Sequence, residues 1–226
     1  MTIQRKENFK IMSVEFIESN QVSIMGDIVS PFVFKCETHG TKFYKAKVNV
    51  RRNSGEIDIL PLVISDELVD TSQEYTGQFV LINGQYRSYN QQDGDKRRLK
   101  LFIFGQGVEL IGKEPDTAAA NHIFLDGYIC KEPLYRETPL GRRITDILLA
   151  VNRPYGESDY IPCICWGKGA ELAAGLEVGA HVQIVGRIQS REYMKKLTET
   201  EAEKRIAYEV SVKSILLVNE EENTKK

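Results

Sequence analysis

Two large rings stand near the ends of one short run in the second half of the chain. The run DYIPCICW carries Tyr160 near its start and Trp166 at its end. Side chains alternate along a β-strand, so these rings share one face, while Ile161, Cys163 and Cys165 share the other. Only one face needs to be the core. Flat rings on the other face are the residue type on which the bases of single-stranded nucleic acid stack.

Further candidate residues flank this run. Tyr155 lies between a proline and a glycine in a loop that also holds Arg153, which favours stacking over a place in the core. Tyr160 either stacks or lines a barrel rim, and Trp166 either stacks or is buried with its N–H satisfied. Lys168 either contacts phosphate or is a solvated lysine. The residues alone leave these alternatives open.

Cations, amides and rings share a face in a later strand. In GRIQSREYMKK, alternation puts Arg187, Gln189, Arg191 and Tyr193 on one side. The first half has the same mixture in GQYRSYNQQ, on Gln85, Arg87, Tyr89 and Gln91. Such a mixture is poor core material but suits single strands: a stacked base contributes about 1–3 kcal/mol, and each neutralised phosphate adds about 0.7 to the log–log salt slope.

Motifs of catalysis and of metal binding are missing. The piece GKG lacks the earlier glycine of a phosphate-binding loop, since position 162 is proline, and no G-x-S-x-G or H-E-x-x-H occurs. Cys36 and His39 have a C-x-x-H spacing, but no second pair completes a zinc site. We therefore predict no enzyme, no cofactor and no metal.

Composition sets broader limits. The formal net charge is -2 and the pI is near 6.0, so a basic footprint for nucleic acid must be local. The sequence has neither a long apolar run nor an apolar leader, so we expect no membrane span and a cytoplasmic, nucleoid-associated protein. The four scattered cysteines are expected to be reduced thiols.

The chain matches itself at a shift of about 101 residues. Glycines, prolines and charged residues keep their register in the two halves, which indicates two copies of one domain. Among the matched pairs are Gly26 with Gly127, Arg52 with Arg153, Asp58 with Asp159, Gly84 with Gly186 and Ser88 with Ser190. We predict an extension at 1–19, domains at 20–112 and 122–218, a linker at 113–121 and a charged, disordered tail at 219–226.

Each copy contains five short β-rich runs and one segment with helical character. The helical segments, SDELVDTSQEY and GKGAELAAGLEVG, follow the third run. This order predicts an all-β protein of two tandem five-stranded OB-fold Greek-key barrels, each with one short helix between strands 3 and 4. The long charged hairpin tips are either solvated loops or fingers that wrap nucleic acid. The acid pairs Glu56/Asp58 and Glu157/Asp159 fall at hairpin edges, where we expect solvation.

The second copy resembles the bacterial single-stranded DNA-binding protein family. The likeness covers most of residues 121–196 and is carried by ILLAVNR, DYIPCICWGKGAEL and VGAHVQIVGRIQSREY. It implies stacking rings at Tyr155, Tyr160, Trp166 and Tyr193, and basic contacts at Lys168, Arg187 and Arg191. The family's acidic tip, which ends in proline and phenylalanine, has no counterpart in NEEENTKK.

The first copy departs from that pattern. Ser54, Ile59 and Ser65 stand where three of the four rings are expected. The basic and aromatic candidates that remain are Arg51, Arg52, Arg87 and Tyr89. The first copy is thus expected to bind weakly through phosphates or to act as a domain that pairs subunits. In the related primosomal replication protein N, one barrel does both.

The leading hypothesis is a non-catalytic binder of single-stranded DNA in replication, recombination, repair or restart. We expect a homodimer with four barrels, because the resemblance implies tetramers for single-barrel chains, and we expect replication or recombination proteins as partners. Two alternatives stay open: a protein-interaction adaptor of the replisome or primosome, which the lost rings favour, and a binder of single-stranded RNA.

Overall fold

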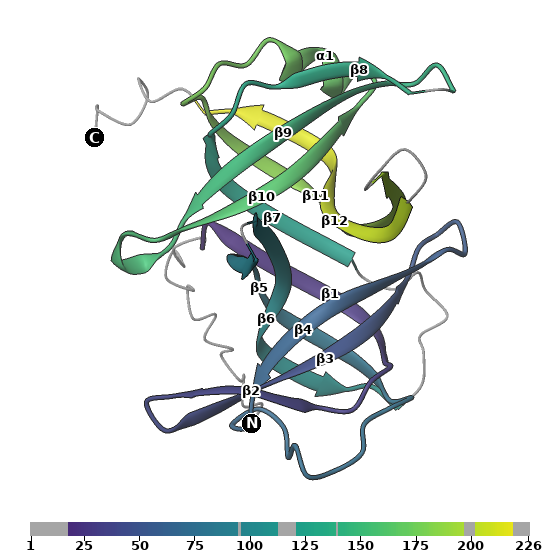
Figure 1. Cartoon of the computed structure of the whole chain (residues 1–226), viewed down its shortest axis with the longest axis vertical. Coiled ribbons are helices and arrows are strands. Elements are labelled where there is room, and N and C mark those ends of the chain that lie inside the picture. Colours follow the sequence, from purple (N-terminus) through teal and green to yellow (C-terminus); the bar gives the residue numbers. More distant parts are fainter. Residues whose placement is uncertain (1–17, 95, 113–120, 139, 197–201, 219–226) are drawn as a thin grey trace, which may run out of the picture.

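Two β-barrels lie end to end along the long axis of the computed structural model (Figure 1). The structure describes residues 18–94, 96–112, 121–138, 140–196 and 202–218. Almost all of the predicted N-terminal extension, linker and tail lies outside these residues. No helix within the described ranges has the length and apolarity needed to cross a membrane.

Each barrel contains six strands rather than the predicted five. The first barrel comprises β1 (Asn20–Ile28), β2 (Val33–Thr38), β3 (Thr41–Arg51), β4 (Ile57–Ser65), β5 (Phe79–Asp93) and β6 (Lys96–Leu110). The second comprises β7 (Asn121–Ile129), β8 (Leu134–Glu137), β9 (Arg143–Asn152), η1 (Pro154–Gly156), β10 (Ser158–Trp166), α1 (Lys168–Ala174), β11 (His181–Lys196) and β12 (Ala202–Leu217). The extra strands, β2 and β8, are short and largely exposed, so they lack the alternating apolar pattern that identifies a half-buried strand.

Only the second barrel has the predicted helix. In α1, Ala170 and Ala173 are fully buried in the core. In the first barrel the matching segment, residues 66–78, forms successive turns, in which Asp70 accepts hydrogen bonds from the backbone N–H of Ser72 and from its hydroxyl. Aspartate and serine side chains that bond to nearby backbone compete with helix formation, which explains why the first-barrel prediction was wrong.

Both barrels close in the same way. Within each barrel the last strand pairs in parallel with the third long strand, β6 with β4 and β12 with β10. The first strand closes the barrel onto the second long strand, β1 onto β3 and β7 onto β9. Inward side chains alternate along the strands to form the apolar core, as in β1, whose alternate residues are buried.

Glycine is required where two strands cross closely. A Cβ on Gly26 would lie 1.8 Å from the carbonyl oxygen of Asn49, and one on Gly127 would lie 2.5 Å from that of Ala150. These two glycines are partners in the internal repeat, so the repeated pattern reflects a packing constraint on barrel closure.

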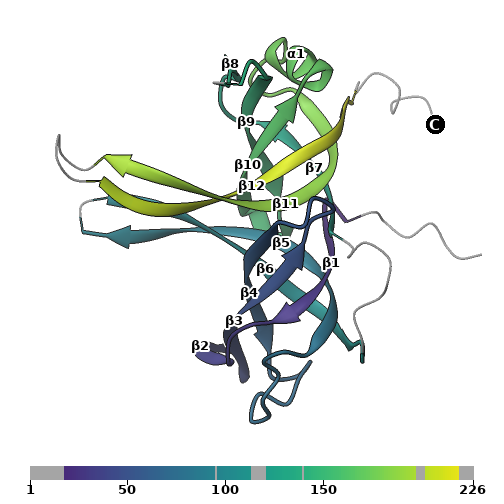
Figure 2. The same cartoon turned by 90° about the vertical axis from the view of Figure 1, so that its right-hand side faces the viewer.

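The two barrels share one continuous sheet. β1 and β7 pair antiparallel, with Val22 opposite Ile123 at the centre of the pairing. Beyond this joint, β5–β6 and β11–β12 extend as two long hairpin arms from the same side of the molecule (Figure 2). A bulge in each arm, at Asn83/Gly84 and at Val185/Gly186, marks the bend away from the barrel.

Two asparagines extend the sheet pairing to the base of each arm. The side-chain amide of Asn20 donates to the carbonyl of Tyr86 at 2.7 Å and accepts from its N–H at 2.8 Å. Asn121 makes the same pair of bonds with Ile188, at 2.8 and 2.9 Å. Each side-chain amide therefore takes the place of a backbone partner where the first strand of its barrel begins.

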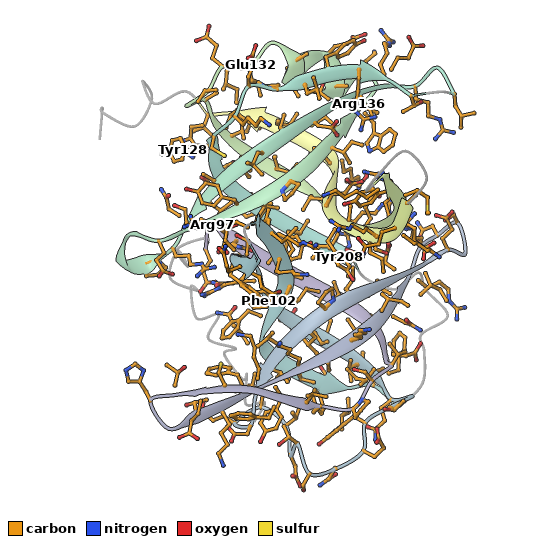
Figure 3. The ribbon with its side chains drawn as sticks, viewed as in Figure 1. Arg97, Phe102, Tyr128, Glu132, Arg136 and Tyr208 are labelled. Atoms are coloured by element: carbon orange, nitrogen blue, oxygen red, sulfur yellow. The ribbon has the colours of Figure 1, made fainter. Side chains whose placement is uncertain are left out.

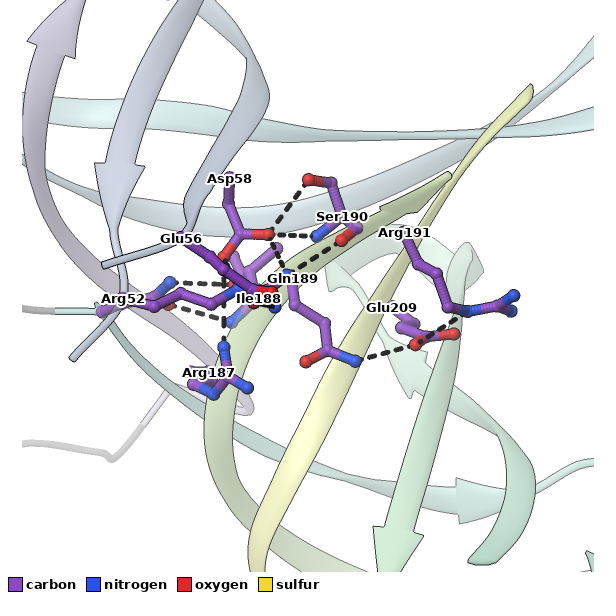
Figure 4. Close-up of polar contacts among 10 residues, drawn as sticks. Arg52, Glu56, Asp58, Arg187, Ile188, Gln189, Ser190, Arg191 and Glu209 are labelled. Atoms are coloured by element: carbon purple, nitrogen blue, oxygen red, sulfur yellow. Dashed lines mark hydrogen bonds and ion pairs between the residues drawn. The ribbon is translucent and has the colours of Figure 1, made fainter. Parts of the chain in front are cut away.

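Each arm is held by an arginine and an aspartate of the other barrel, and Figure 4 shows this contact for the arm of β11 and β12. Asp58 is fully buried and accepts hydrogen bonds from the N–H of Ser190 at 2.6 Å and from its hydroxyl at 3.0 Å. Arg52 forms two hydrogen bonds to Asp58, at 2.7 and 2.6 Å, and donates to the carbonyl of Ser190 at 2.9 Å. The hydrogen bond to Asp58 is the main cause of a raised pKa for Arg52.

The reciprocal contact joins the second barrel to the first arm. Asp159, also buried, accepts from the N–H of Ser88 at 2.5 Å. Arg153 pairs with Asp159 and donates to the carbonyl of Ser88 at 2.9 Å. The Ser88 hydroxyl accepts from the N–H of Tyr160 at 2.8 Å. The two contacts are related by the internal repeat and fasten the barrels crosswise.

These contacts bear on two sequence-based expectations. Arg52 and Arg153, which the sequence predicts to bind nucleic acid, direct their guanidinium groups to the junction between the barrels. Asp58 and Asp159 were expected to be solvated, yet they are 0% and 1% exposed. The expectation holds only for Glu56 and Glu157, whose side chains are exposed.

Replacing Gly26 by alanine is expected to lower the free energy of unfolding by about 1–3 kcal/mol, because the new methyl group meets rigid backbone. The matched control is Gly169→Ala in α1, where nothing lies within 4 Å of the added carbon. It should be neutral or stabilising by up to about 1 kcal/mol. Urea unfolding followed by circular dichroism measures both, and equal effects would contradict the packing argument.

Asp58→Ala is expected to lower the free energy of unfolding by about 3–5 kcal/mol, since it leaves the partly buried guanidinium of Arg52 and the N–H of Ser190 without their acceptor. Glu56→Ala removes only the exposed partner of the same arginine and should cost less than about 1 kcal/mol. The two variants are compared by denaturant titration. Similar losses in both would show that the buried carboxylate does not hold the arm.

Candidate nucleic-acid interface

The outer face of β10 carries two exposed rings. Tyr160 is 42% exposed and Trp166 is 37% exposed, whereas Ile161, Cys163 and Cys165 point into the core. The alternation predicted from the sequence is therefore present. Burial raises the pKa of the Cys165 thiol to about 12, and all four cysteines are free.

Trp166 lies on the outside of the barrel rather than in its core. Its indole N–H donates to the hydroxyl of Ser211 on β12 at 3.1 Å. This bond anchors one edge of the ring to the neighbouring strand while leaving part of the ring surface open. Lys168, the first residue of α1, is exposed two positions further along the chain.

The base of the second arm continues this face. Gln189 donates to Glu209 at 2.8 Å, and the Nε of Arg191 lies 3.7 Å from the same carboxylate. The Arg191 guanidinium lies 5.8 Å from the centre of the Tyr193 ring, and Tyr193 is 37% exposed. The ring and the cation therefore form a contiguous pair on β11.

Arg187 and Arg87 occupy matching places at the junction of the barrels. The Nη1 of Arg187 lies 3.9 Å from Asp58, beyond hydrogen-bond distance. Burial, followed by the nearby charge of Arg52, lowers the pKa of Arg187. Burial and then Arg153 lower that of Arg87. Arg187 thus lies beside the Arg52–Asp58 ion pair, and Arg87 lies near the Arg153–Asp159 ion pair.

The remaining predicted residues are scattered over both barrels. Tyr155 lies in η1, and its side chain is outside the described part of the structure. Arg51 is exposed at the end of β3. Tyr89 is 39% exposed on β5. On β4 of the first barrel, Ile59 is exposed and Ser65 is buried, so this strand presents no ring.

Within the described ranges, no group of three His, Cys, Asp or Glu side chains is arranged to hold a metal ion. The described surface of the second barrel instead offers four exposed rings, on Tyr135, Tyr160, Trp166 and Tyr193, together with exposed lysine and arginine side chains. Rings and fixed cations bind flat bases and phosphates through stacking and charge, and this binding requires no hydrogen-bond code.

Comparison with known proteins agrees with this geometry. Residues 120–218 match the model of the single-strand binding protein family. Single-stranded DNA-binding protein 3 of Listeria innocua is 39% identical over 80 residues, which cover 32% of this chain and 50% of the relative. The single-stranded DNA-binding protein of Halalkalibacterium halodurans is also 39% identical over 80 residues, covering 32% and 48%. The chain thus spans about half the length of the curated relatives it matches.

The likeness to a solved structure extends across both barrels. A deletion mutant of the single-stranded DNA binding protein from Thermus aquaticus superposes with a TM-score of 0.68, covering 92% of this chain and 98% of that one. At 18% identity, this comparison shows the shared fold. It supports the OB-fold architecture predicted from the internal repeat. The match to the single-strand binding protein family is thus confined to the second barrel, residues 120–218, which is less than half of the chain.

Proposed function

We propose that this protein binds single-stranded DNA without catalysing a reaction, and that the outer face of the second barrel is its main binding surface. The observation that carries the proposal is the exposure of Tyr160, Trp166 and Tyr193 on one barrel, with Arg191 against the last ring. Large exposed rings cost solvation free energy unless a ligand covers them, and nucleic-acid bases match them in shape and polarity.

The spacing of the rings suits an extended strand. Tyr160 and Trp166 are six residues apart on β10, a separation of about 20 Å at the usual rise per residue. One base cannot contact both rings, so a bound segment of several nucleotides runs along the strand. This length is consistent with the roughly 4–16 nucleotides that an OB-fold binds.

Local positive charge supplies the phosphate contacts. The chain has a formal net charge of -2, so attraction depends on Lys168, Arg187 and Arg191 near the rings. Each phosphate that they neutralise should steepen the salt dependence by about 0.7 in log–log slope. Binding of this kind is tolerant of base sequence, since every base has a face that stacks.

We further propose that two chains associate to present four barrels, and that the protein acts in replication, recombination, repair or restart on DNA of the nucleoid. The relatives named above are single-stranded DNA-binding proteins, which supports DNA over RNA as the ligand. A protein-adaptor role is the alternative, favoured by the lack of rings on β4.

Titration with poly-dT is expected to quench the fluorescence of Trp166, the only tryptophan, because the base stacks on its exposed ring. The apparent affinity should fall as salt is raised, with a log–log slope of about -2 for three phosphate contacts. Unchanged emission together with affinity independent of salt would contradict the proposal and favour the adaptor role.

Replacing Tyr160 and Tyr193 together by alanine should weaken poly-dT binding by about 2–6 kcal/mol, at about 1–3 kcal/mol for each stacked base. The matched control, Tyr160→Phe with Tyr193→Phe, keeps both rings and should bind within about 1 kcal/mol of the wild type. Both are measured by tryptophan quenching. A loss below about 1 kcal/mol in the alanine variant would remove these rings from the site.

A further inference from the structure

Two phenylalanines lie on the outer face of β6 in the first barrel. Phe102 and Phe104 are half-buried and alternate with Leu101 and Ile103, which are buried in the core. Figure 3 labels Phe102 and Arg97 on β6, and Tyr208 on β12 of the other arm. The residues of β12 that correspond to these two phenylalanines are not aromatic.

The pairing identifies the counterparts. Tyr86 opposes Ile103 in the first arm, as Ile188 opposes Val210 in the second. Since Tyr86 and Ile188 are partners in the repeat, Phe102 and Phe104 correspond to Glu209 and Ser211 of β12. Ser211 is the residue to which Trp166 donates its hydrogen bond.

The aromatic ring at this place is therefore supplied by a different strand in each barrel. In the second barrel, Trp166 lies on β10 and a serine lies on β12. In the first, Ser65 takes the tryptophan's place on β4 and Phe104 takes the serine's place on β6. Val63 pairs with Phe104 as Ile164 pairs with Ser211, so the two arrangements occupy the same patch of the barrel surface. The first barrel has not lost its ring there, because it supplies one from the neighbouring strand.

Further rings surround this pair. Tyr89 packs edge-on against Phe102 with ring centres 5.8 Å apart, and Phe43 lies 5.8 Å from Phe104. We call these four residues the barrel-one ring cluster: Phe43, Tyr89, Phe102 and Phe104.

Cations lie directly over the cluster. The Nζ of Lys35 is 5.7 Å from the centre of Tyr89 and 5.9 Å from that of Phe102, and the Arg87 guanidinium is 4.9 Å from that of Phe104. Lys45, exposed on β3, opposes Val63 and so lies in the row of Phe104.

This composition favours nucleic acid as the occupant. The buried centres of protein–protein interfaces are depleted in lysine, whereas a single strand requires rings and cations in alternation. The arm that carries the cluster also contacts the second barrel, because the hydroxyl of Ser88 accepts the N–H of Tyr160. Arg87, which lies over Phe104, is close enough to Arg153 and Asp159 of that barrel to interact with their charges.

We propose that the barrel-one ring cluster is a second stacking site, which takes up the single-stranded DNA that leaves the second barrel. This inference rests on the proposed function of the second barrel. It replaces the expectation that the first barrel contacts only phosphates or only pairs subunits.

The test uses Phe102→Leu with Phe104→Leu, which keeps apolar bulk and folding but removes the aromatic faces. Affinity for an oligo-dT of roughly 35 nucleotides, long enough for both barrels, should fall at least about 10-fold. Quenching of Trp166 by an oligo-dT of roughly 8 nucleotides should be unchanged. The change Phe102→Tyr with Phe104→Tyr should retain long-oligomer affinity.

Phe34→Leu is the control, since Phe34 is 56% exposed on the same barrel and contacts Tyr44 instead of the cluster. It should leave both affinities unchanged. Sedimentation of each variant reports whether the cluster joins two chains.

Long-oligomer affinity within about twofold of the wild type would overturn the inference while leaving the proposed function intact. A changed oligomeric state in the leucine variant would also overturn it, by assigning the cluster to contact with a second copy. If the wild-type protein binds neither oligomer, both the proposed function and this inference fail.

Discussion

The arrangement of both barrels depends on two buried carboxylates. Asp58 and Asp159 each neutralise an arginine of their own barrel and accept the backbone N–H of a serine in the opposite arm. A buried charge is tolerated only when it is paired and hydrogen-bonded, so the arm cannot shift without leaving that charge exposed to an apolar environment. The crosswise contacts thus fix both arms on one side of the joined sheet, beside the faces that carry the rings.

Much of the fold follows from the sequence because its determinants are local. The repeat was visible through glycines that the barrel closure requires, since a side chain at Gly26 would collide with backbone. Strand alternation predicted that Tyr160 and Trp166 share one face of β10, and the structure shows that this face is the exposed one. The helix α1 followed from its alanines, which fit a tightly packed position.

Other features could not be derived, because they depend on contacts between distant residues. Asp58 lies in an ordinary hairpin sequence, and only the approach of Ser190 from the other barrel buries it. This contact also directs Arg52 to the junction of the barrels, and the reciprocal contact with Ser88 does the same for Arg153. Phe102 and Phe104 were not recognised because the comparison of the two copies looked for rings at matching positions of β4 and β10. In the first barrel the rings lie instead on β6, the strand that pairs with β4.

We propose that both barrels bind one single strand. Photo-cross-linking of an oligonucleotide containing 5-bromodeoxyuridine, with mass-spectrometric mapping, would then join one oligonucleotide to peptides containing Tyr160 and Trp166 and also to peptides containing Tyr89 and Phe102. Cross-links confined to other faces, such as that of Tyr128 and His181, would contradict it.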